Sequence, residues 1–140
     1  MVWCYVALYG TFGKKYKVGD IMKYRRQTET GDYSFGYNQN DYVSGNLAVG
    51  YAIKSKILLF YGEWWEDLGT GIPMFQSIIG QGKSDALKNS IQQMVTERIM
   101  EIDEVAVVNN VEVTFADRTL KMNVSVTTTN NEVVEQEVII

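Results

Sequence analysis

Apolar residues recur at helical spacing in two stretches near the middle of the chain. Residues 44–61 start at the N-cap candidate Ser44 and stop before Gly62, and residues 84–103 start at the N-cap candidate Ser84. The apolar stripes consist of Val49, Ile53, Ile57 and Phe60 in the first stretch and of Leu87, Ile91, Met94, Val95 and Ile99 in the second. This spacing predicts two amphipathic helices.

A short apolar segment, Met74 to Ile79, lies between these two stretches. Pro73 precedes it, and proline suits the first turn of a helix because its missing N–H would have no partner there. The glycines in Gly80-Gln81-Gly82 then interrupt the pattern. We therefore predict a third, short helix between the two longer ones.

Apolar and polar residues alternate in the last third of the chain, which is typical of strands with one buried face. The alternation runs through Val111 to Phe115 and again from Leu120 to Val126, and Val133 to Ile140 completes the chain. The turn candidates are Ala116-Asp117-Arg118 and Asn130-Asn131, and asparagine tolerates left-handed backbone geometry. These features predict an antiparallel meander.

The first part of the chain has the texture of short strands joined by glycine-containing turns, with a hairpin turn at Thr30-Gly31-Asp32. We predict one α+β domain over residues 1–140, with a strand-rich part (1–42), a helical part (43–104) and a β-meander (105–140). In this fold, two longer helices and one short helix cover one face of a mainly antiparallel sheet, preceded by the N-terminal strands.

Composition narrows the possible functions. With 46% hydrophobic and 21% charged residues the chain is predicted to be globular, and its net charge of -4 disfavours nucleic acid as a partner. The basic residues between Lys14 and Arg26 are explained as well by a solvated strand face. Cys4 is the only cysteine and histidine is absent, which excludes an internal disulfide, Ser-His-Asp or Cys-His catalysis and histidine-bound zinc. We expect no cofactor, no metal, no signal peptide and no membrane span.

Two motifs suggest chemistry, and each has a plainer explanation. Gly80 to Ser84 resembles the end of a phosphate-binding loop, but Ser77 stands where that pattern needs glycine, and a helix-to-helix connection fits the segment better. Glu63 and Asp67 could serve as the carboxyl pair of a peptidoglycan hydrolase, although carboxylates this close along the chain commonly form a solvated turn.

The same acidic segment and the end of the chain are candidates for protein contacts. Trp64 and Trp65 are adjacent, so they point in different directions: one is expected in the core and the other at a contact, unless both pack internally. The last strand ends in three apolar residues, Val138, Ile139 and Ile140, which cannot all face one side of a sheet. We expect this strand to pair with another chain, and a buried central strand is the alternative.

The run Gly62-Glu63-Trp64-Trp65-Glu66-Asp67-Leu68-Gly69-Thr70-Gly71-Ile72-Pro73 resembles a segment of the baseplate wedge or sheath-initiator family of phage tails and contractile injection systems. The segment Asn46 to Ile53 is similar to the family's first helix, and the alternating residues after Val111 are similar to its closing hairpin. The resemblance covers about residues 30 to 140, and it does not extend to residues 1–29.

The resemblance implies a structural protein of the virion tail baseplate, made in the cytoplasm of the bacterial host, that initiates the sheath if the tail contracts. Its implied partners are other wedge proteins, together with sheath proteins and tube or hub proteins, with about six copies around a sixfold baseplate. The candidate partner-binding residues are Glu63, Trp64, Trp65, Asp67, Pro73, Val138, Ile139 and Ile140. Some family members carry a lysozyme-like name, so a tail hydrolase acting through Glu63 and Asp67 is the alternative function, and a stand-alone binding module with a deep pocket is a third.

Overall fold

A computed structural model describes residues 22–117 and 119–140 of the chain. Its elements follow the order β1, β2, α1, α2, α3, β3, β4 and β5, with a short 3-10 turn (Asn38–Asp41) before β2. The predicted features before Met22, which include Cys4 and the basic residues Lys14, Lys15 and Lys17, lie outside this range. The α+β class with antiparallel sheets is confirmed.

The main sheet consists of β3 (Val105–Ala116), β4 (Thr119–Thr128) and β5 (Val133–Ile139) in the antiparallel order β3-β4-β5. β4 and the second half of β3 alternate between buried apolar side chains and more exposed polar ones, as the sequence pattern predicts. Asn131 adopts φ 61° in the turn before β5, which confirms the expected left-handed geometry. Among the strands of the described residues the last one lies at the edge of its sheet, so within them the alternative of a buried central strand is wrong.

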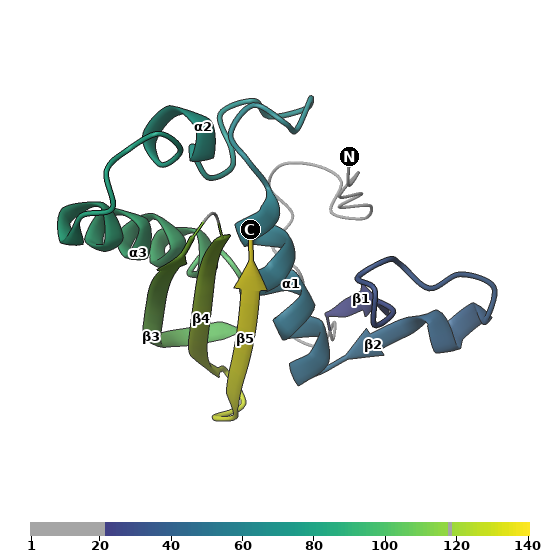
Figure 1. Ribbon diagram of the computed structural model, residues 1–140. Helices are drawn as coiled ribbons and strands as arrows, with labels where there is room; N and C mark the ends of the chain where they lie inside the picture. Colours follow the sequence, from purple (N-terminus) through teal and green to yellow (C-terminus); the bar gives the residue numbers. More distant parts are fainter. Residues whose placement is uncertain (1–21, 118) are drawn as a thin grey trace.

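Three helices accompany this sheet: α1 (Asn46–Leu58), α2 (Met74–Ser77) and α3 (Asp85–Ile99). Figure 1 shows α1 beside β5 and α3 beside β3, while α2 lies with the loop beyond the end of α1. The apolar stripes enter a common core with the inner face of the sheet, in which Ile53, Val95 and Met122 are fully buried. The burial of such side chains is the main force that holds the layers together.

The predicted helix boundaries are partly correct. Ser84 caps α3 by accepting the Leu87 N–H at 3.2 Å, as expected. Ser44, in contrast, belongs to β2, and Gly45 occupies the N-cap position of α1 with φ 67°, so that cap prediction is wrong. The first helix also ends at Leu58, because the next residues turn into an extended pairing with Ile72. Likewise, α3 ends at Ile99 and not near Asp103.

The N-terminal strands form a separate two-stranded sheet, β1 (Lys23–Arg25) with β2 (Tyr42–Ser44), which projects from the body of the molecule (Figure 1). The predicted turn at Thr30-Gly31-Asp32 lies within the connection between these strands. Met22 and Val43 join the same buried core as α1. This arm is therefore anchored at its base by apolar packing.

Candidate functional site

The acidic-aromatic loop, residues 59–73, connects α1 to α2 and is closed at its base by backbone pairing. Phe60 and Ile72 form a parallel bridge, with the Tyr61 N–H on the Ile72 carbonyl and the Ile72 N–H on the Leu59 carbonyl, each at 2.9 Å. Gly71 lies against this bridge with φ 108°, and a Cβ atom there would stand 2.5 Å from the Phe60 carbonyl carbon. Only glycine fits at this position.

A salt-bridge network links the base of this loop to both long helices. Arg98 of α3 donates to the Gly71 carbonyl at 3.2 Å and to Glu101 at 2.8 Å, and Lys56 of α1 also donates to Glu101 at 2.8 Å. Partial burial opposes ionisation of Glu101, but the hydrogen bonds and positive charges of Lys56 and Arg98 outweigh it, so the pKa of this carboxyl lies below its ordinary value. The network fixes the loop relative to the helices.

The carboxylates of the loop stabilise its own turns. The Glu63 carboxylate accepts the Phe60 N–H at 3.2 Å, and the Asp67 carboxylate accepts the Gly69 N–H at 3.0 Å. Both residues are exposed, and neither lines the hollow beside Gln92 and Val111 or the hollow beside Arg26 and Tyr37. A hydrolase needs its carboxyl pair across a substrate cleft, so this geometry gives the hydrolase alternative no support.

Large apolar side chains are exposed on the loop and on α2. Trp65 is 78% exposed, whereas Trp64 is half-buried and is not part of the core, so the expectation that one indole enters the core is wrong, as is the alternative that both pack internally. Pro73 is half-buried at the start of α2. The apolar patch, as we name these exposed residues between α1 and α3, consists of Tyr61, Trp65, Leu68, Phe75 and Ile79. Several large exposed apolar side chains on one segment of the chain are typical of a protein contact.

The last strand brings the other candidate residues to the edge of the sheet. Val138 is buried in the core, Ile140 is half-buried, and Ile139 is 53% exposed on the opposite face. The Leu120 and Ile140 backbones exchange both hydrogen bonds, so the even-numbered residues of β5 bond to β4. The odd-numbered residues of β5 consequently direct their N–H and C=O groups away from the sheet.

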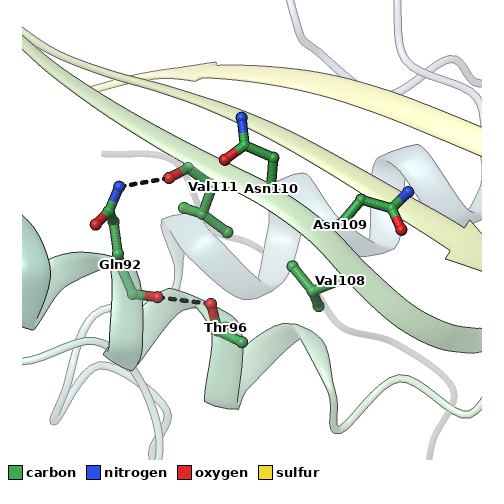
Figure 2. A pocket seen from close by; sticks show the side chains of 6 residues that line it. All are labelled: Gln92, Thr96, Val108, Asn109, Asn110 and Val111. Atoms are coloured by element: carbon green, nitrogen blue, oxygen red, sulfur yellow. Dashed lines mark hydrogen bonds between the residues drawn. The ribbon is translucent and has the colours of Figure 1, made fainter.

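The opposite edge, formed by β3, is partly covered. The Gln92 side chain of α3 donates to the Val111 carbonyl at 2.6 Å, and the Thr96 hydroxyl donates to the Gln92 carbonyl at 2.7 Å (Figure 2). Gln92 and Thr96 border an open hollow of about 260 Å³ along Val108 to Val111. The strand is also irregular here, with register shifts between Val105 and Val107 and between Val108 and Asn110.

The segment that resembles a phosphate-binding loop is a connection between two helices. Gly80 to Ser84 joins α2 to α3, where the Lys83 ammonium donates to the Asp117 carbonyl at 2.8 Å and Ser84 caps the helix. A phosphate-binding loop requires a preceding strand, and a helix stands there instead. Over the described part of the chain, no cluster of three or more acidic or cysteine side chains fits a metal ion, and no helix is long and apolar enough to cross a membrane.

Comparison with known proteins identifies the family. Residues 22–132 match the model of the contractile injection system sheath initiator. The chain belongs to this sheath-initiator family. No curated protein matches it. Membership assigns a structural, sheath-initiating role in a contractile injection system, and it confirms the resemblance seen in the residues around Trp64.

The sequence pattern indicates the loop and the last strand, but it does not indicate some residues that shape both. Arg98 and Gly71 lie 27 positions apart and meet only in the folded chain, so no local pattern signals their contact. Glu135 and Glu137 were visible as the polar half of an alternating strand. Their importance depends on which strand forms the sheet edge, and periodicity does not determine that.

Proposed function

We propose that this protein is a non-catalytic subunit of the baseplate wedge of a contractile tail, present in about six copies, where it helps to assemble the baseplate and starts the sheath. Its place is the tail baseplate, reached after synthesis in the cytoplasm of the bacterial host. Membership of the sheath-initiator family supports the coarse role. The finer role rests on the geometry of the last strand.

The observation that carries this proposal is the regular free edge of β5. The strand pairs with β4 in unbroken register from Val133 to Ile139, and the one described hydrogen bond on its outward side is donated by the neighbouring Gln136 side chain to the Glu137 carbonyl. An edge of this kind accepts a further strand because each outward N–H and C=O needs a partner that another chain can supply. A sheath subunit that adds a strand here would extend the sheet across the protein boundary.

The apolar patch provides a second contact in this proposal. Trp65 of the loop is 78% exposed and Phe75 of α2 is 63% exposed, and the Arg98 network fixes the base of the loop. Large aromatic side chains on a rigid support contribute much of the binding free energy at protein interfaces. We assign this surface, with Glu63, Trp64, Asp67 and Pro73 around it, to neighbouring wedge proteins.

Glu135→Pro tests the role of the β5 edge in sheath initiation. The Glu135 N–H faces away from β4, so proline removes no hydrogen bond within the sheet but blocks a bond to an incoming strand. We expect a folded protein that still enters the baseplate and fails to start the sheath. Electron microscopy of tails that were assembled with the variant in place of the wild-type protein measures the fraction that carry sheath.

Glu135→Ala is the matched control, because it removes the same side chain and keeps the N–H. This control is expected to leave most tails sheathed. The circular dichroism spectrum shows whether Glu135→Pro is folded. If the spectrum is unchanged and the fraction of sheathed tails equals that of the wild type, the proposed role of β5 is refuted. A deletion of Val138 to Ile140 is less informative, because Val138 is part of the core.

A further inference from the structure

The exposed face of β5 carries charged and apolar side chains in a regular order, beside the backbone groups that point outward from the sheet. Val133, Glu135, Glu137 and Ile139 have outward N–H and C=O groups, and their side chains share the face opposite the helices. Val133 is 61% exposed and Ile139 is 53% exposed. Figure 1 shows β5 at the margin of the sheet. Along this edge, the two carboxylates lie between the two apolar residues.

The two carboxylates are unpaired within the described part of the chain. Neither Glu135 nor Glu137 forms an ion pair or accepts a hydrogen bond there through its side chain. Lys121 on β4 is opposite Ile139 on this face, and Glu112 of β3 adds a further negative charge. Three carboxylates on this face therefore outnumber the single ammonium group, so a strand that approaches the β5 edge meets a net negative charge.

A second copy of the chain is a poor match for this edge. If two β5 strands paired antiparallel through their outward groups in the central register, Glu135 of one copy would lie opposite Glu137 of the other, twice. Registers shifted by one hydrogen-bonded step bring one of these glutamates opposite itself. Like charges directly opposite each other destabilise a strand pair. The glutamates thus keep the edge available without self-association.

We infer that the free edge of β5 selects an extended segment of another protein that carries Lys or Arg at two alternate positions, opposite Glu135 and Glu137. Apolar residues flank these two positions and contact Val133 and Ile139. The backbone pairing supplies the attachment, and the charges choose the partner and its register. This inference rests on the proposed function, since it names the chemistry of the strand that β5 accepts.

Synthetic peptides test the charge preference on the full-length protein. Three peptides share an alternating valine and threonine sequence and differ only at two alternate positions, which are Lys, Thr or Glu. Each is titrated onto the isotope-labelled protein, and the amide chemical shifts of Val133, Glu135, Glu137 and Ile139 are followed by NMR. These four amides face the free edge, so they report strand addition directly.

We expect the Lys peptide to bind about tenfold more tightly than the Glu peptide at low salt, because two favourable pairs replace two unfavourable ones. The preference should shrink at high salt, since both carboxylates are exposed. In the double variant Glu135→Lys/Glu137→Lys, the order of peptide affinities should reverse, so that the Glu peptide binds more tightly than the Lys peptide. Glu112→Lys, on the same face but on β3, is the matched control and should retain the wild-type order.

The outcomes separate this inference from the proposed function. If the Thr and Lys peptides shift the four amides with equal affinity, the edge pairs without choosing charge: the inference fails and the proposed function stands. If the double variant keeps the wild-type order, the inference fails in the same way. If no peptide moves these amides, the β5 edge does not accept strands and both fail.

Discussion

The two edge strands of the sheet differ in what protects them. β3 is accompanied by α3, is interrupted by register shifts, and has its Val111 carbonyl bonded by Gln92. β5 is regular, and on its outward side only the Glu137 carbonyl accepts a described hydrogen bond, from the neighbouring Gln136 side chain. Proteins commonly protect sheet edges with helices, bulges and charges. Each edge strand is accompanied by a helix, α3 at β3 and α1 at β5. Only β3 has register shifts, whereas β5 is regular and has the charges of Glu135 and Glu137, so β5 is the better template for a further strand.

The largest expected effect concerns the helix that accompanies β3. Ile91 of α3 is 1% exposed, whereas Val133 at the β5 edge is 61% exposed. Ile91→Ala should lower the free energy of unfolding by about 2–5 kcal/mol, because it leaves a cavity between helix and sheet. Val133→Ala should cost less than about 1 kcal/mol. Urea unfolding followed by circular dichroism measures both values.

These two variants test whether the β5 edge is exposed in the full-length protein. A loss of stability for Val133→Ala as large as that for Ile91→Ala would mean that Val133 is buried in the full-length protein. The β5 edge would then be covered by the chain itself, and the difference between the edges would disappear.

A smaller effect is expected for the hydrogen bond that protects the β3 edge. Gln92→Ala removes the donor at 2.6 Å from the Val111 carbonyl, and the net contribution of such a bond is about 1 kcal/mol. Gln93→Ala is the control, because Gln93 is the next residue of the same helix and its amide contacts only the exposed Glu97 side chain. The difference between the two variants in urea unfolding isolates the edge bond. Equal stabilities would show that Gln92 does not protect β3.

Much of the fold was predictable because hydrophobic periodicity reports burial directly. The spacing of Ile91, Val95 and Ile99 specified a helix, and the alternation around Met122 specified strands. Ser84 and Asn131 were predicted correctly because their geometry depends on local chemistry. Ser44 was misassigned because pairing of β2 with β1 outweighed its tendency to cap a helix.

The functional surfaces were only partly predictable, since they depend on contacts between distant residues. The segment around Trp65 was recognised from its composition and resemblance, but the support from Arg98 required the folded chain. The three residues at the end of the chain were grouped as partner-binding candidates, and the fold separates them: Ile139 is exposed while Val138 is in the core. Alternation gives each strand two faces, and only strand order tells which backbone edge is free.

The smallest expected effect concerns the ion pairs between the helices beside the two edge strands. Lys56 of α1 and Arg98 of α3 both bind Glu101, whose pKa is below its ordinary value in the folded protein. Because the folded-state pKa is the lower one, the stabilisation is fully present above the unfolded-state pKa and is lost as pH falls through the folded-state value. The side chains are partly exposed, so solvent screening limits the contribution to less than about 1 kcal/mol.

Glu101→Gln should therefore be less stable than the wild type at about pH 7, and the difference should vanish as the carboxyl protonates in acid. Glu97→Gln is the matched control, because Glu97 lies on α3 and binds the uncharged Gln93 amide. Urea unfolding of the three proteins across this pH range measures the effect, and comparison with the wild type removes the titration of the other carboxylates. A stability difference for Glu101→Gln that does not change with pH would exclude the ion pairs as its cause, and α1 and α3 would then be held together by apolar packing alone.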